Sequence, residues 1–290
     1  MTTTVGIGLA FVAMLCWGIG DFLIQRSVRK IGKAETLFVI SAFGALVLTP
    51  FVYRDLGAFV LGDLHTLLVA SGAAVILLLA AVLDFEALRV GKLSVVEPIW
   101  SLEIPVAGLL AFFVLSERLT MLQTGLIFVL IVGLVLVSIR GKITKAAFFE
   151  KGAFIALVAA IVMGSANFFI GWGARLLDPL MINFVVNIFM AVVTFGYIVF
   201  SGGVKQLVRD VAAQRRLLFS MSVTDNTAWV AFAAAMVYAP LTIAVALSQS
   251  YIIIAVLLGL FVNRERISAR QKIGLVGALI AAIVLAATVG

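Results

Sequence analysis

Apolar runs long enough to cross a bilayer recur along almost the whole chain, separated by short polar segments. A transmembrane helix needs about 20 mainly apolar residues. The pattern predicts ten such spans with almost nothing left for a soluble domain, so we expect an all-α integral membrane protein. The spans are 5–26, 35–53, 66–88, 93–115, 121–139, 151–174, 180–201, 216–238, 241–262 and 269–289.

The sequence also contains an internal repeat, which bears directly on the fold. Residues 17–29 align with 163–175 at a shift of 146, and Glu117 aligns with Glu265 at a shift of 148. Two units of five helices follow, at 1–140 and 147–290. Because five is odd, the second unit must be inverted in the membrane relative to the first, as in many secondary transporters.

Both repeats carry the same helix-start signal before their last span. Thr120 with Gln123, and Ser268 with Gln271, have the spacing of a capping box. A glutamate precedes each cap by three residues, at Glu117 and Glu265. A carboxylate there meets the positive end of the helix dipole. We favour this structural role for the glutamates over a role in substrate binding.

The basic residues predict an orientation. All but three of the 21 lie in or beside the connections that follow the odd-numbered spans, and the exceptions are Arg54, Arg118 and Arg175. The positive-inside rule places the basic face in the cytoplasm, which leaves both termini outside. The longest of these connections, 202–215, mixes basic residues with Leu207 and Val208, which predicts a short amphipathic helix at the interface.

Composition excludes several classes of protein. Only 12% of the residues are charged, against about 25% in a typical soluble domain. With one cysteine (Cys16) and one histidine (His65) there is no basis for zinc or Cys-His chemistry. The net charge of +7 lies beside apolar helices, which indicates membrane topology and no nucleic-acid partner. We expect no metal, no cofactor and no enzymatic activity, and we interpret the first apolar run as a retained helix.

The segment 93–106 places two glutamates and two prolines inside an apolar span. An ionisable side chain costs roughly 2.5 kcal/mol or more at the bilayer centre, so Glu97 and Glu103 should face a protein interior or a watery path. Pro98 and Pro105 remove backbone donors and bend or break the helix. We infer that this helix lines a polar cavity. The alternative is a structural kink with carboxylates paired to neighbouring helices.

Depth separates the intramembrane acids. At 1.5 Å per residue, Glu103 lies about 15 Å from the span boundary at Leu93, and Asp225 lies about 13 Å from Arg216, so both approach the midplane. Three acids lie nearer the cytoplasmic end: Asp21, Asp84 and Glu97. The remaining candidates for substrate binding are polar and aromatic residues of the spans, although the aromatic ones also suit packing or an interfacial belt: Trp100, Trp172, Asn187, Asn226, Gln249 and Tyr251.

The ionisable side chains near the middle of the predicted spans are acidic, and this limits the class of substrate. No lysine or arginine falls in the middle of a predicted span, whereas a carrier of phosphorylated substrates should place cationic groups there. Carboxylates beside aromatic rings suit protons or organic cations. Burial favours the protonated form of a carboxyl group, so Glu103 and Asp225 are the best candidates for proton coupling.

At this point the residues resemble the drug/metabolite transporter superfamily, EamA type. The resemblance covers nearly the whole chain and lies in the W-G-x-x-x-F pattern at 17–22, a weaker copy at 164–168, Pro105 twelve residues before Glu117, and Gly125, Gly133 and Gly274. It implies a monomeric or loosely associated secondary carrier, often an exporter, with a cavity in the middle of the bundle. Members usually keep both termini in the cytoplasm, opposite to the charge count here, and generally carry fewer acids in their spans.

We therefore expect a proton-coupled exporter of a small cationic or amine-bearing metabolite or drug in the prokaryotic inner membrane. Its partners would be the substrate, protons and the bilayer. The alternative is a uniporter or exchanger of neutral amino acids whose carboxylates are structural. A membrane enzyme is disfavoured because the chain has no His, Cys or metal-ligand cluster. A scaffold is disfavoured because a passive bundle is better without buried acids.

Overall fold

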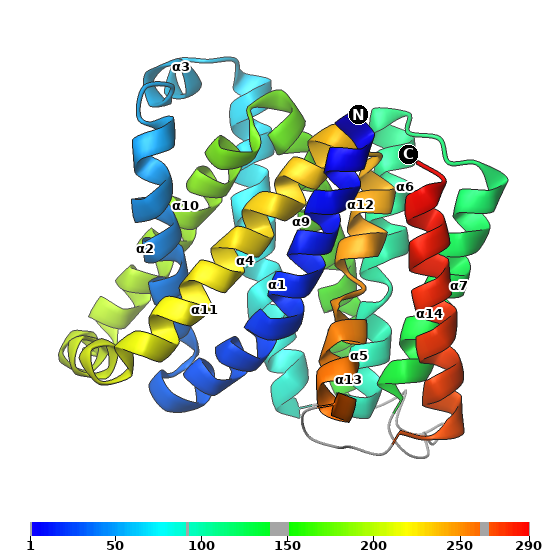
Figure 1. The fold of residues 1–290 in the computed structure, drawn as a ribbon. Helices are drawn as coiled ribbons and strands as arrows, with labels where there is room; N and C mark the ends of the chain where they lie inside the picture. Colours follow the sequence, from blue (N-terminus) through cyan, green and yellow to red (C-terminus); the bar gives the residue numbers. More distant parts are fainter. Residues whose placement is uncertain (1, 91–92, 140–150, 262–266, 290) are drawn as a thin grey trace.

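The computed structural model describes residues 2–90, 93–139, 151–261 and 267–289, and these are almost entirely helical (Figure 1). The first repeat contains α1 (Thr2–Ile31), α2 (Lys33–Val52), the short α3 (Leu56–Val60), α4 (Leu64–Val90), α5 (Leu93–Trp100), α6 (Glu103–Leu115) and α7 (Met121–Ser138). The second contains α9 (Lys151–Leu176), α10 (Pro179–Phe200), α11 (Val204–Tyr238), α12 (Leu241–Ser248), α13 (Tyr251–Phe261) and α14 (Ala269–Ala287).

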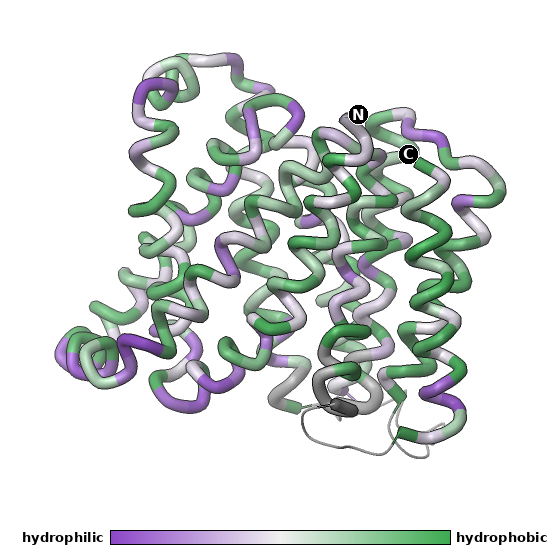
Figure 2. Tube along the Cα trace, viewed as in Figure 1, coloured by the Kyte–Doolittle hydropathy of each residue, from purple (hydrophilic) through white to green (hydrophobic). Residues whose placement is uncertain are grey.

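Each predicted span corresponds to one described helix or to two helices separated by a break. Within the described residues, eight helical segments are long and apolar enough to cross a membrane. One of them, Pro98–Leu115, runs across the end of α5 and α6, and a shorter apolar stretch covers Leu241–Ile254. The long helix α11 is less apolar because it carries Asp225, Asn226 and a basic first part. Figure 2 shows hydrophilic residues gathered at the two ends of the bundle and apolar runs between them.

The predicted amphipathic helix at 202–215 is the first part of α11. The backbone leaves helical geometry at Gln214 (φ −111°, ψ 17°), which separates this part from the span that follows. Leu207 is buried, and Val208 on the neighbouring position is exposed. The helix is therefore amphipathic, and its location at the membrane interface stays a prediction.

The helix pairings repeat when the two halves are exchanged. α1 packs on α11 and α4 on α9, while α2 pairs with α10 and α7 with α14. This exchange pattern is that of a pseudo-two-fold axis. Each half has an odd number of spans, so the axis must lie in the membrane plane, and the two termini lie at the same end of the bundle (Figure 1).

Two spans are broken in the middle, at equivalent places in the two halves. α5 ends at Trp100 and α6 begins at Glu103, while α12 ends at Ser248 and α13 begins at Tyr251. Both predicted spans 93–115 and 241–262 are thus discontinuous. Pro98 lies inside α5 without ending it. The break in the first repeat lies just before Pro105, whose missing N–H costs nothing in the first turn of α6.

Glycines allow the inverted halves to approach closely. A Cβ on Gly164 in α9 would lie 2.7 Å from the Glu103 carbonyl oxygen and 2.7 Å from Val106 Cβ in α6. A Cβ on Gly18 in α1 would meet Ile254 Cβ at 2.6 Å and the Tyr251 carbonyl oxygen at 3.3 Å in α13. The same contact is thus made twice, and it places Glu103 and Tyr251 at equivalent positions. The two W-G-x-x-x-F-like patterns provide these contact glycines.

Gly164→Ala should destabilise the protein because the new methyl group collides with backbone. Such overpacking typically costs about 1–3 kcal/mol, and it would also push Glu103 away from α9. Gly125→Ala is the matched control, since a Cβ there meets nothing within 4 Å. Thermal unfolding of the purified variants checks this. Equal midpoints for the two variants would show that α6 and α9 separate without cost.

Candidate functional site

The two helix breaks meet at a small polar pocket. Side chains from both breaks line it: Ser101 and Glu103 from the first, Gln249 and Tyr251 from the second. The indole of Trp100 and the side chain of Ile104 complete much of the wall. Helix breaks expose backbone dipole ends inside the membrane, and in inverted-repeat transporters such breaks form binding sites. The pocket is therefore the candidate site that the fold itself indicates.

Glu103 is the central acid of this region. It is 8% exposed and is the first residue of α6. Asn167 of α9 donates a hydrogen bond from its Nδ2 to Glu103 Oε2 at 3.3 Å. Gly164 lies one turn before Asn167 on the same helix, so the close approach of α9 to α6 brings the amide to the carboxylate.

Two further acids act on this centre from other helices, and a third is linked to it through one of them. Asp84 of α4 and Asp21 of α1 both lie close enough to Glu103 to repel its negative charge. Asp21 acts in the same way on Asp225 of α11, which is 6% exposed. Asp21 itself is solvent-exposed. Four helices therefore contribute four carboxyl groups that are linked electrostatically, and in the sequence no lysine or arginine falls in the middle of a predicted span.

Several polar atoms around the cluster are unsatisfied. Asp84 lies beside the indole of Trp100, yet Asp84 Oδ1 and Trp100 Nε1 have no partner at hydrogen-bonding geometry among the described residues. The same holds for Ser101 Oγ and for Asn167 Oδ1. Buried polar groups are normally paired with protein or water. This density of unpaired groups is what a site for a polar ligand or for water would have.

Tyr251 belongs to an aromatic cluster beside the pocket. Its ring lies 6.3 Å from that of Trp17, which also contacts Trp229 at 5.1 Å and Phe232 at 5.0 Å. Trp17 is itself buried. The tryptophan of the W-G-x-x-x-F pattern therefore packs the core between α1 and α11, and Tyr251 joins it to the pocket.

The structure does not bring all of the predicted site residues together. Asn187 donates to Asn226 Oδ1 at 3.0 Å, and this pair lies between α10 and α11, where Asn226 borders an apolar hollow of about 430 Å³. Trp172 packs on Phe168 and on His65. These three residues are absent from the lining of the pocket between the breaks. The side chain of Glu97 lies outside the described part of the structure.

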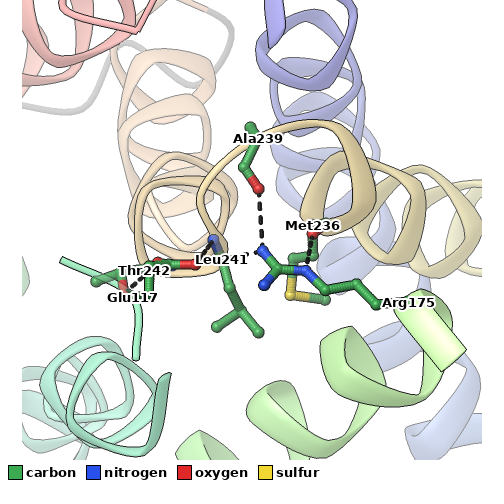
Figure 3. Close-up of polar contacts among 6 residues, drawn as sticks. All are labelled: Glu117, Arg175, Met236, Ala239, Leu241 and Thr242. Atoms are coloured by element: carbon green, nitrogen blue, oxygen red, sulfur yellow. Dashed lines mark hydrogen bonds and ion pairs between the residues drawn. The ribbon is translucent and has the colours of Figure 1, made fainter. Parts of the chain in front are cut away.

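A second polar cluster ties four helix ends together at the end of the bundle that holds the termini (Figures 1 and 3). Arg175, in the last turn of α9, donates from Nε to the Met236 carbonyl oxygen at 2.7 Å and from Nη2 to that of Ala239 at 3.3 Å. The same Nη2 lies 3.3 Å from Glu117 Oε2. We call these contacts, together with those of Glu117 to α12, the Glu117–Arg175 clamp.

Glu117 caps a different helix from the one predicted. Its two carboxylate oxygens accept hydrogen bonds from Leu241 N at 2.8 Å, from Thr242 N at 2.9 Å and from Thr242 Oγ1 at 2.9 Å. The carboxylate therefore meets the positive end of the α12 dipole, far away in sequence. The predicted capping boxes are both present, at Thr120–Gln123 and Ser268–Gln271.

Sequence reasoning missed two features of this arrangement. The charge pattern marks Arg175 only as an exception to the basic bias, and no motif marks Ser101. The repeat contained a signal for Asn167, which aligns with Asp21, but alignment alone does not reveal that it contacts Glu103. Within the described residues, no group of three or more His, Cys, Asp and Glu side chains is arranged to hold a metal ion.

Comparison with known proteins agrees with this architecture. The model of the EamA-like transporter family matches residues 4–139 and again residues 150–287. A solved structure described only as the crystal structure of a protein has a TM-score of 0.75 with this chain at 15% sequence identity, and the match covers 98% of each chain. No curated protein matches the sequence. The double match confirms the predicted all-helical membrane fold built from two repeats.

Proposed function

We propose, from the premise that this chain belongs to the EamA-like transporter family of drug and metabolite transporters, that it exports a small cationic or amine-bearing metabolite in exchange for protons. As a multi-pass membrane protein of this family it has a small-molecule substrate and the lipid bilayer as partners. The proposal also includes proton coupling, the outward direction of transport and a location in the prokaryotic inner membrane. It further includes a monomeric or loosely dimeric state.

The observation that carries the proposal is the set of carboxyl groups around Glu103. The charges of Asp21 and Asp84 both act on Glu103, and the charge of Asp21 also acts on Asp225. Close carboxylates repel one another, so the cluster gains when it binds a proton or a cation. A single site that either can occupy provides exchange, because each ligand lowers the affinity for the other.

One observation favours the alternative of a uniporter or exchanger of neutral amino acids. Asn167 already supplies a hydrogen bond to Glu103, as expected of a structural carboxylate. Transport into proteoliposomes distinguishes the two. An imposed pH gradient should drive accumulation of an amine substrate in the first case, whereas only the substrate gradient should matter in the second. Accumulation that ignores the pH gradient would reject proton coupling.

We predict that both termini face the outside of the cell. The charge bias of the connections motivates this, although the family resemblance points the other way. A C-terminal alkaline phosphatase fusion should be active and a C-terminal green fluorescent protein fusion dark. The reverse pattern would show that the folding of the inverted halves overrides loop charge.

A further inference from the structure

The pocket between the two helix breaks has the size of one small polar group. Its volume is about 10 Å³, and a cavity needs roughly 10–15 Å³ on this measure to hold one water molecule. The apolar part of its wall includes Ile104, Leu134 and Ile252. The pocket therefore has room for one group of the size of water and offers that group a few polar contacts.

The polar residues with acceptor oxygens in the wall of the pocket include Ser101, Glu103 and Gln249. Ser101 lines the pocket and is 5% exposed, and its Oγ has no hydrogen-bond partner in the described part of the chain. Glu103 and Gln249 also line the pocket, and each of these side chains carries oxygen that can accept a hydrogen bond. Three residues with acceptor oxygens, one of them a carboxyl group, thus surround one small space, and they come from both inverted halves.

We propose that this pocket binds the primary ammonium group of the substrate. The inference rests on the proposed transport of an amine and narrows its class. A primary ammonium has three N–H donors, one for each of Ser101, Glu103 and Gln249. Its positive charge is opposite to that of the Glu103 carboxylate. Two of the lining residues, Trp100 and Tyr251, are aromatic, and aromatic rings attract cations.

The same geometry rejects a quaternary ammonium group. A trimethylammonium has no N–H donor, so it leaves the Ser101 hydroxyl and the Gln249 amide oxygen unpaired. It is also larger than a primary ammonium group by three methyl groups. A site built to pair with a donor discriminates strongly against an analogue that lacks it. We expect at least a tenfold preference for the primary ammonium.

Binding of two matched probes to the purified full chain tests the proposal. Isothermal titration should show that n-butylammonium binds at least tenfold more tightly than butyltrimethylammonium. Ser101→Ala and Gln249→Leu should each reduce this preference severalfold. Ser222→Ala is the matched control, because Ser222 Oγ is also buried without a partner but does not line the pocket. The control should keep the full preference.

Three results would overturn the inference: equal affinity for the two probes, no binding of either, or a preference that survives in both pocket variants. The wild-type comparison needs no variant, so poor folding of a variant leaves the test intact. Transport separates this inference from the proposed function. Equal pH-driven flux of both probes would reject the pocket and keep the carrier. Selective binding of n-butylammonium without any flux would keep the pocket and reject the carrier.

Discussion

Glu103→Gln should reduce pH-gradient-driven transport at least tenfold while leaving the fold intact. The amide keeps the shape of the side chain and retains an oxygen that accepts the hydrogen bond from Asn167 Nδ2. It removes the charge that a proton or a cation would neutralise. The repulsion by Asp84 and Asp21 disappears as well, so the variant should be at least as stable to heat as the wild type.

Flux should therefore fall by roughly tenfold or more, because each 1.4 kcal/mol of lost interaction is a factor of ten in binding. Binding of the amine should become weak and nearly independent of pH. Asp55→Asn is the control, since Asp55 is exposed at the N-cap position of α3 and its side chain makes no capping bond. If Glu103→Gln still concentrates substrate against its gradient, the proton travels elsewhere, and Asp225 is the next residue to replace.

The sequence was informative about features that depend on neighbouring residues. Hydrophobic runs set the helices, and the spacing of Thr120 and Gln123 sufficed for the capping box, because both partners lie on one turn. The repeat predicted which residues are equivalent in the two halves. Glu103 and Tyr251 each open the second helix after a break, 148 residues apart.

The sequence did not predict the contacts between helices that are remote from one another in the chain. The break was expected at the prolines, yet α5 continues through Pro98, and the chain turns at Ser101 and Leu102. Nothing local marks Asn167 as the donor to Glu103, because the contact depends on how closely α9 approaches α6. Asn187 and Trp172 share the polarity or aromaticity of site residues but lie on helix faces that point elsewhere.

Glu117→Gln should loosen the end of the bundle that holds the termini. In the wild type, the Glu117 carboxylate accepts bonds from Leu241 and Thr242 and contacts Arg175 (Figure 3). The amide turns an N–H₂ group toward donors, so at least one charged hydrogen bond is lost. Such bonds are each worth about 1.5–3 kcal/mol. We expect a lower thermal midpoint than in Arg118→Gln, which replaces the exposed neighbouring charge.

Loss of this hydrogen bond in Glu117→Gln should also make the end of the bundle that holds the termini open more often. The Glu117–Arg175 clamp joins the ends of α9 and α11 to the start of α12 there. A carrier with alternating access must separate these helices once in each cycle if substrate passes at this end. Ala244, two residues beyond Thr242, is fully buried in α12. In a Cys16→Ser background, a cysteine placed at Ala244 should react with a membrane-impermeant maleimide about tenfold faster when Glu117→Gln is added, since 1.4 kcal/mol corresponds to a factor of ten. Equal labelling rates in the Glu117→Gln and Arg118→Gln proteins would show that the clamp only braces the fold and does not control access.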